Sequence, residues 1–213
     1  MPSKRVVIFA GGELSPEYLN VLDEGDYIIG ADRGALFLIT HGITPDISVG
    51  DFDSISAEEL EQVKAGSQET ITCDAVNKDL TDSEMALDLA LNTQPDHILL
   101  LGVTGSRIDH TLASIQMMTR AQQRQVSCSV MDCHNYVTLT GSQAIVEERG
   151  YTYVSLLPLT HEVTGITLEG FQYPLHDATL KLGQSLGVSN RLITPSGTVS
   201  IESGLLLIIQ SKD

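Results

Sequence analysis

The chain has 213 residues, enough for one large domain or two small ones with a real core, and its 42% hydrophobic and 19% charged residues are ordinary for a soluble globular protein. A formal net charge of −16 argues against nucleic acid as a partner, because a phosphate backbone attracts a basic face, and it mildly favours a cationic substrate. The apolar run after Met1–Arg5 covers only Val6–Gly11, too short for a signal segment or a membrane span, so we expect a cytoplasmic protein with no membrane partner.

Strands and helices are expected to alternate over residues 1–142. Apolar runs bounded by turn residues predict buried strands, and two capping-box patterns, Ser56–Glu59 and Thr81–Glu84, mark helix starts. The expected strands cover 5–10, 27–31, 47–49, 69–72, 97–101 and 126–131. The expected helices cover 35–40, 56–66, 81–90 and 111–124. This alternation predicts an α/β domain with a mostly parallel sheet and helices on both faces.

The texture of the sequence changes near Thr140. Short β-type runs follow one another, separated by Gly, Pro and Asn, with no convincing helix between them. These runs cover 144–147, 151–156, 163–168, 178–180, 198–201 and 205–210. We therefore expect residues 143–213 to form an all-β sandwich domain.

The three cysteines are far apart in the chain and odd in number. Cys73, Cys128 and Cys133 form neither a disulfide framework nor a C-x-x-C metal spacing. We expect free thiols that are partly buried as small apolar side chains.

Two carboxylates follow the short strand that should end near Val49. Asp51 and Asp53 are two residues apart, and side chains at this spacing on an extended backbone point the same way. Oxygen ligands in a loop suit a hard cation, and Mg²⁺ typically takes one or two protein carboxylates together with phosphate oxygens. The stretch therefore predicts a site for Mg²⁺ and phosphate, with a solvated acidic turn as the alternative.

The entrance of the third expected helix carries Lys78, Asp79 and Asp82. Capping and the helix dipole alone could explain Asp82 and Glu84. They do not explain Lys78, whose charge is wrong for a helix start and suits a phosphate that a metal also binds.

A glycine-containing loop, Gly102–His110, lies between an expected strand and an expected helix. Backbone N–H groups and a helix N-terminus can bind phosphate in this arrangement, and Arg107 could bind it with two hydrogen bonds. The alternatives are a glycine turn with an Arg107–Asp109 surface pair and a capping role for His110. The sequences Asp32–Gly34 and Ser189–Asn190 are, by themselves, explained by turn chemistry. In parallel sheets ligands bind beyond the carboxyl ends of the strands. Each of the following segments comes after an expected strand, so all should gather at one edge of the sheet: Gly11–Gly12, Asp32, Asp51 and Gly102–His110.

Taken in order, the motifs resemble the thiamine pyrophosphokinase family. The matching segments extend along nearly the whole chain: Gly50–Ile55, Lys78–Glu84, Gly102–His110, Ser155–Leu159 and Leu186–Asn190. Each motif is weak alone, but the ordered set is specific. The resemblance implies an ATP-binding α/β domain and a thiamine-binding β-sandwich in a homodimer with active sites at the subunit interface. The implied reaction transfers the diphosphoryl group of ATP to the hydroxyl of thiamine and releases AMP.

The resemblance also assigns roles to residues of this chain. The implied Mg²⁺ ligands are Asp51, Asp53 and Asp79. The residues expected at ATP are Asp32, Arg33, Gly34, Lys78, Gly102, Thr104, Gly105, Ser106, Arg107 and His110. Those expected at thiamine are Asp82, Ser189 and Asn190. Lys78 and Arg107 would stabilise charge on the phosphates, and either Asp82 or Asp109 would orient or deprotonate the thiamine hydroxyl.

The sequence departs from the commoner family pattern at Arg33, Ser106 and Arg191. Arg191 stands where an acid is usual, close to the expected site of a cationic substrate. The chain also has no Trp, so any ring stacked on thiamine must come from Phe, Tyr or His. A Mg²⁺-dependent phosphohydrolase and a non-catalytic sensor of nucleotide or thiamine are the competing hypotheses.

Overall fold

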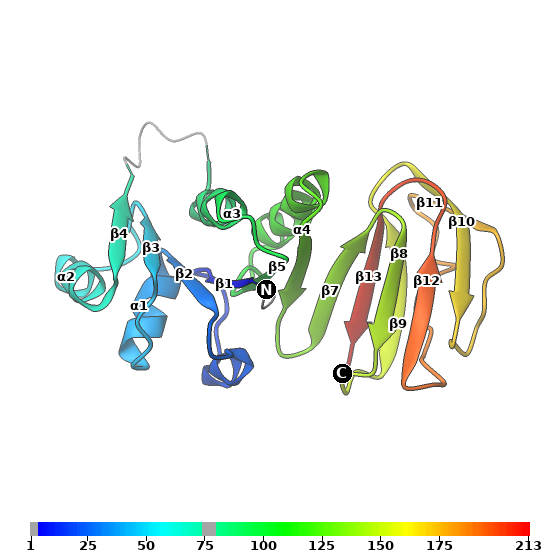
Figure 1. Ribbon diagram of the computed structural model, residues 1–213, viewed down its shortest axis with the longest axis horizontal. Helices are drawn as coiled ribbons and strands as arrows, with labels where there is room; N and C mark the ends of the chain where they lie inside the picture. The colour runs from blue at the N-terminus through cyan, green and yellow to red at the C-terminus, as the bar shows by residue number, and fades with distance from the viewer. Residues whose placement is uncertain (1–3, 74–79) are drawn as a thin grey trace. The chain divides into compact units, whose positions relative to one another are not determined.

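The computed structural model describes residues 4–73 and 80–213 and divides the chain into two compact units, Met1–Asp132 and Cys133–Asp213 (Figure 1). Lys78 and Asp79, two of the expected site residues, lie outside the described residues. The expected boundary after residue 142 falls later than this division. The difference arises because β7 (Asn135–Thr140) pairs with β13 (Leu206–Ser211) and so belongs with the second unit.

The first unit is built on a parallel sheet. Its described strands are β1 (Arg5–Phe9), β2 (Tyr27–Ala31), β3 (Ile47–Gly50), β4 (Glu69–Thr72), β5 (His97–Leu101) and β6 (Ser127–Met131). They lie in the order β4-β3-β2-β1-β5-β6, and each described pairing is parallel. β1 and β5 are buried almost throughout, as their continuous apolar sequences require.

Helices cover both faces of this sheet, as expected. They are η1 (Pro16–Val21), α1 (Arg33–Thr40), α2 (Ala57–Gly66), α3 (Asp82–Asn92) and α4 (Ile108–Gln123). α1 packs with α2, and α3 packs with α4 on the opposite face (Figure 1). Both predicted capping boxes are present, at Ser56 with Glu59 and at Thr81 with Glu84. In the described segments, no helix combines the length and apolar character needed to cross a membrane.

Two helix boundaries differ from the sequence expectation. α1 begins at Arg33 and α4 at Ile108, each earlier than predicted, because neither start has a side-chain cap that the sequence could reveal. The 3₁₀ helix η1 was not expected, although Ser15 caps it and Pro16 occupies its first turn.

The strand order creates a switch point between β1 and β5. From β1 the chain builds outward through β2, β3 and β4, and it then returns to add β5 and β6 on the other side. At such a point the loops after the two neighbouring strands diverge to opposite faces and leave a crevice at the carboxyl edge. The fold therefore favours a ligand site where the chain leaves Phe9 and Leu101.

The second unit is a β-sandwich. One sheet has the order β7-β13-β9, in which β9 covers Tyr153–Pro158. The other contains β8 (Gln143–Glu147), β10 (Glu162–Glu169), β11 (Ala178–Lys181) and β12 (Ser196–Ser200), in the order β11-β10-β12-β8. Side chains from both sheets form one core, including Leu156 of β9 and Leu168 of β10. β7 was not predicted, because only two of its six residues are buried and its apolar signal is weak.

Candidate active site

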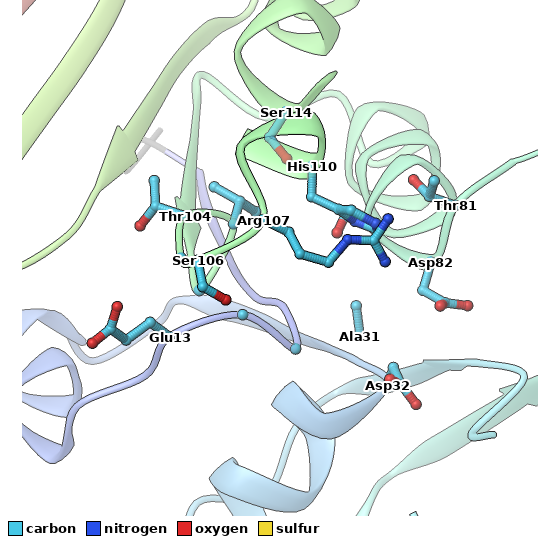
Figure 2. Close-up of a pocket in the computed structure, with 16 residues that line it drawn as sticks. Glu13, Ala31, Asp32, Thr81, Asp82, Thr104, Ser106, Arg107, His110 and Ser114 are labelled. Carbon is cyan, nitrogen blue, oxygen red and sulfur yellow. The ribbon is translucent and has the colours of Figure 1, made fainter. Parts of the chain in front are cut away.

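A cavity of about 630 Å³ lies at the carboxyl edge of the first unit's sheet, at the β1/β5 switch point. The loops after β1 and β5 line it, together with the end of β2 and the first turns of α3 and α4 (Figure 2). Of the expected site residues, those lining it are Asp32, Asp82, Gly102, Thr104, Gly105, Ser106, Arg107 and His110. Segments far apart in the chain thus meet where the sheet topology predicts a ligand.

Backbone hydrogen bonds join the loops after β1 and β5. The N–H of Gly12 donates to the carbonyl of Gly102 at 2.7 Å, and that of Glu13 donates to the carbonyl of Thr104 at 2.9 Å. A Cβ on Gly12 would collide with the Gly102 carbonyl and would lie 2.6 Å from the Thr104 oxygen. Only glycine permits this approach, so Gly12 closes one side of the cavity with backbone alone.

Asp51 and Asp53 lie close together, but for a different reason from the one expected. The backbone is not extended between them, because β3 ends at Gly50 and Phe52 has a left-handed φ of 55°. Phe52 is buried against Ala35 of α1 and Val63 of α2, which anchors the turn. The N–H of Asp53 then donates to Asp51 Oδ1 at 3.2 Å.

Asp32 completes a group of three carboxylates. Ligand oxygens of Asp32, Asp51 and Asp53 all lie within 4.8 Å of one another. Asp32 itself has a φ of 51°, and its Oδ2 accepts a hydrogen bond from Ser54 Oγ at 2.6 Å. Its Oδ1 is buried and has no hydrogen-bond partner among residues 4–73 and 80–213. Burial raises the pKa of Asp32, and the charges of Asp82 and Asp51 raise it further against the opposing hydrogen bonds from Ser54 and the Arg33 backbone.

Asp82 contacts the same region from α3. Its Oδ1 accepts a hydrogen bond from the backbone N–H of Asp51 at 3.3 Å. The capping alternative holds instead for Glu84, whose Oε2 accepts from the Thr81 N–H at 2.9 Å while Thr81 Oγ1 accepts from the Glu84 N–H. Since Thr81 and Glu84 cap α3, the Asp82 carboxylate remains directed at the end of β3.

Arg107 and Asp109 form the surface pair that was the alternative reading of their loop. Arg107 NH2 donates to Asp109 Oδ2 at 2.6 Å, with both side chains about two-thirds exposed, at 68% and 64%. The hydrogen bond from Arg107 is the main cause that lowers the pKa of Asp109. Arg107 also lines the cavity, so the pair does not exclude a role at phosphate.

Arg33 and Gly34 were expected at ATP, but neither lines the cavity. Gly34 instead allows α1 to start against β1, since a Cβ there would collide with the Phe9 carbonyl. The lining residues to which the sequence assigned no site role are Gly11, Gly12, Glu13, Ala31, Thr81, Ser83, Val103 and Ser114, although Gly11–Gly12 was expected at this edge of the sheet. The spacing of His110 and Ser114, one helical turn apart, was a signal that could have found Ser114.

Ser189 and Asn190 lie in the second unit, in the segment between β11 and β12. Ser189 is exposed with a φ of 63°, and its N–H donates to Ser155 Oγ at 3.0 Å. Asn190 is buried, and its side chain bonds to the backbone of Tyr173. The nearby Arg191 lies with its guanidinium 4.9 Å from the centre of the Tyr153 ring.

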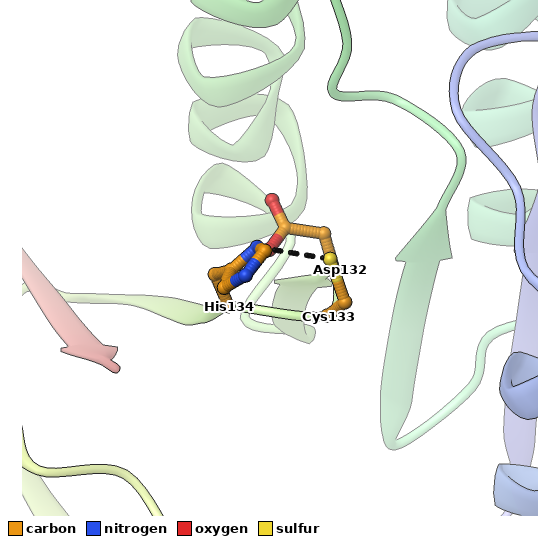
Figure 3. A group of neighbouring side chains, drawn as sticks. All are labelled: Asp132, Cys133 and His134. Carbon is orange, nitrogen blue, oxygen red and sulfur yellow. Dashed lines mark hydrogen bonds between the residues drawn. The ribbon is translucent and has the colours of Figure 1, made fainter. Parts of the chain in front are cut away.

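The three cysteines are free thiols, as expected, but the expected burial holds only for Cys73 and Cys128. Cys128 is buried, and burial raises its pKa to about 12, so it is inert near neutral pH. Cys133 is exposed, and its Sγ lies 3.0 Å from Nδ1 of the adjacent His134 (Figure 3). Neither Cys133 nor His134 lines the cavity described above.

Comparison with known proteins decides what this arrangement belongs to. The model for "Thiamin pyrophosphokinase, catalytic domain" matches residues 18–130, and that for "Thiamin pyrophosphokinase, vitamin B1 binding domain" matches residues 142–206. The chain belongs to the thiamine pyrophosphokinase family. A thiamine pyrophosphokinase of Bacillus subtilis is 36% identical over 214 residues, covering 99% of this chain and 100% of the relative.

Solved structures of thiamine pyrophosphokinases agree in fold. The Bacillus subtilis enzyme superposes with a TM-score of 0.92 at 34% identity, covering 99% of this chain and 100% of that one. The Geobacillus thermodenitrificans enzyme gives 0.88 at 32% identity, covering 98% of each chain. The resemblance read from the motifs, the two-part fold class and the enzyme assignment are therefore confirmed. The phosphohydrolase and sensor hypotheses gain no support.

Proposed function

We propose that this protein transfers the diphosphoryl group of ATP to the hydroxyl of thiamine, giving thiamine diphosphate and AMP. The observation that carries the proposal is the cavity at the β1/β5 switch point, because Asp32 both lines it and belongs to the group with Asp51 and Asp53. A triphosphate held by backbone amides would thus meet carboxylates able to bind a cation. The expected homodimer, with active sites at its interface, and the cytoplasmic location are parts of this proposal.

The glycine-containing loops provide the ATP site. In the segment from Gly102 to Ser106, small residues allow phosphate oxygens to approach the backbone. The 16-residue helix α4 begins shortly afterwards, and the dipole at its N-terminus favours negative charge. Arg107 would exchange its Asp109 partner for a phosphate oxygen when ATP binds. Lys78, expected from the sequence, would supply a second positive charge.

The carboxylates fit a hard divalent cation such as Mg²⁺. They provide oxygen ligands only, and the buried Asp32 Oδ1 has no partner within the described part of the chain. Asp32, Asp51 and Asp53 would hold the ion, with Asp79 as a further ligand expected from the sequence. When bound, the ion supplies neutralisation of the negative charge on the phosphates.

The reaction requires one proton acceptor. The thiamine hydroxyl oxygen bonds to the β-phosphorus while the bond from that phosphorus to the α-phosphate oxygen breaks, and AMP leaves with the electron pair. Between the two candidate bases, Asp82 is favoured over Asp109. Asp82 lines the cavity and accepts a hydrogen bond from the Asp51 N–H, whereas Asp109 does not line the cavity. Asp82 would accept the hydroxyl proton, and Arg107 would stabilise charge on the phosphates.

Product analysis tests the proposal. Purified protein incubated with ATP, Mg²⁺ and thiamine should form AMP and thiamine diphosphate in equal amounts, and no AMP should form when thiamine is omitted. ADP as the product, or phosphate release that does not depend on thiamine, would contradict diphosphoryl transfer.

A further inference from the structure

Asn190 is a buried polar residue whose side chain is directed at the protein backbone. It is 6% exposed. Its Oδ1 accepts hydrogen bonds from the N–H groups of Tyr173 at 3.0 Å and Arg191 at 2.8 Å, and its Nδ2 donates to the Tyr173 carbonyl at 2.7 Å. An amide oxygen has two lone pairs, and both are occupied. The Asn190 oxygen is therefore not available to a small ligand.

The backbone of Asn190 makes a second set of contacts. Its N–H donates to the carbonyl of Val154 in β9 at 2.9 Å, and its carbonyl accepts from the Val154 N–H at 2.8 Å. Gln172 adds a hydrogen bond from its N–H to the Arg191 carbonyl at 2.8 Å. Asn190 thus joins β9, the segment after β10 that contains Tyr173, and the segment before β12. We call these contacts of Asn190 with Tyr173 and Val154 the Asn190 clamp.

The clamp holds residues that reach solvent. Tyr173 is 59% exposed and Val188 is 44% exposed, although hydrogen bonds hold the backbone at both residues. Ser189, the residue before Asn190, has a left-handed φ of 63° and is also exposed. A conformation of this kind in a non-glycine residue persists only where its surroundings fix it, and such residues gather at ligand sites.

We propose that Asn190 is a positioning residue for thiamine binding, which fixes the Tyr173 segment beside Ser189 and does not itself contact the substrate. The proposal rests on the proposed function, because thiamine is the ligand that the second unit is expected to bind. It changes the role that the sequence suggested for Asn190 and leaves that of Ser189 as it was. Both lone pairs of the Asn190 side-chain oxygen accept hydrogen bonds, and the residue exposes little surface. Asn190 can therefore affect a ligand only through the segments that it holds in place.

The test uses the absence of tryptophan from the chain. Tyr173→Trp places a single fluorescent reporter on the clamped segment, and its anisotropy is compared with and without Asn190→Ala. The KM values for thiamine and for ATP are measured separately, with Asn190→Ala in the otherwise wild-type chain. We expect the anisotropy to fall and the KM for thiamine to rise roughly tenfold, since two backbone groups of Tyr173 lose their partner, while the KM for ATP is unchanged.

Two further variants keep the test decisive. Asn190→Asp retains an acceptor for the Tyr173 and Arg191 N–H groups but places an oxygen against the Tyr173 carbonyl, so it should reproduce both effects if Asn190→Ala fails to fold. Ser189→Ala is the matched control. It removes an exposed hydroxyl beside an intact clamp, so it should raise the KM for thiamine without changing the anisotropy.

The outcomes separate the proposal from the function on which it rests. A raised KM for thiamine with unchanged anisotropy would mean that Asn190 contacts thiamine directly, and a lowered anisotropy with unchanged KM would mean that the clamp does not serve binding. Either result overturns the proposal. If the wild-type protein forms no thiamine diphosphate, the proposed function fails together with the thiamine role of Asn190, while the anisotropy still decides whether the clamp exists.

Discussion

The two ends of the strands in the first unit's sheet each carry a partly buried aspartate, Asp26 at the amino edge and Asp32 at the carboxyl edge, and the surroundings of the two carboxylates differ. At the amino edge, Arg5 donates from Nε at 2.7 Å and from NH2 to the two oxygens of Asp26, whose side chain is only 4% exposed. At the carboxyl edge, Asp32 accepts from Ser54 but keeps one buried oxygen without a partner in the described part of the chain.

The pKa values of the two groups move in opposite directions. Burial raises the pKa of Asp26, but hydrogen bonds from Arg5 and from the Asp23 backbone outweigh it and hold the pKa below its ordinary value. For Asp32, burial and the charges of its acidic neighbours outweigh the hydrogen bonds that it accepts, and its pKa is raised. The carboxylate of Asp26 is thus stabilised by Arg5, whereas that of Asp32 has no such cationic partner in the described part of the chain and would be stabilised by a bound cation.

The largest effect should come from removing a ligand at the carboxyl edge. Asp51→Asn should reduce the rate of thiamine diphosphate formation by about 10²–10³-fold or more, because a charge that stabilises the bound phosphates through the cation is lost. Product formation at saturating substrates measures it, with circular dichroism to show that the fold is intact.

The matched control lies at the other end of the same strand. Asp46 precedes β3, and its carboxylate accepts from the Ile28 N–H at 2.7 Å and from Gln68 at 3.1 Å. Asp46→Asn keeps an acceptor there and should retain activity close to that of the wild type. An active Asp51→Asn protein would show that the carboxyl edge does not bind the catalytic cation.

The next largest effect should be on stability at the amino edge. Asp26→Ala removes the carboxylate that accepts two hydrogen bonds from the partly buried Arg5 guanidinium. This change should lower the free energy of unfolding by about 2–4 kcal/mol. Asp23 lies 3.0 Å from the same guanidinium but has a side chain that is 77% exposed. Asp23→Ala should therefore change the free energy of unfolding by less than about 1 kcal/mol, and equal losses in the two variants would contradict the contrast.

The sequence predicted much of the carboxyl edge, because a parallel sheet brings strand ends together whatever their loops contain. It found Asp51 and Asp53 from their spacing, yet the anchor that brings them together is Phe52, whose burial between α1 and α2 depends on packing. The sequence placed Gly11–Gly12 at this edge but assigned no role to Gly12, since its need for glycine arises only from the neighbouring Gly102 carbonyl. Asn190 shows the same limit, because its residue type suggested a ligand contact while its partners are backbone groups of Tyr173.

The contribution of Asp26 should depend on pH in a direction fixed by its lowered pKa. Above about pH 5 the carboxyl is ionised in both the folded and unfolded chain, so its contribution is complete. As the pH falls below the ordinary value of about 3.9, the unfolded chain takes up the proton first, and the contribution is lost as the pH passes through the folded pKa. Arg5, Asp23 and His97 are the charged or titratable groups nearby. Melting temperatures of the wild type and Asp26→Asn should differ clearly at pH 5 and converge as the pH falls toward 3; a difference that grows between pH 5 and 3 would reverse the assignment.

The smallest effect should have the opposite sign, at Asp32. Asp32→Asn keeps an oxygen for the Ser54 hydroxyl, replaces the unpartnered oxygen with an N–H donor and removes a charge near Asp51 and Asp82. Without metal, in the presence of a chelator, the variant should be more stable than the wild type by about 0.5–1 kcal/mol, measured by denaturant unfolding. With Mg²⁺ and ATP the order should reverse, because only the wild type gains the full free energy of binding. A variant that is less stable than the wild type in chelator would place Asp32 with Asp26, as a residue that stabilises the fold, and would remove the distinction between the two edges of the sheet.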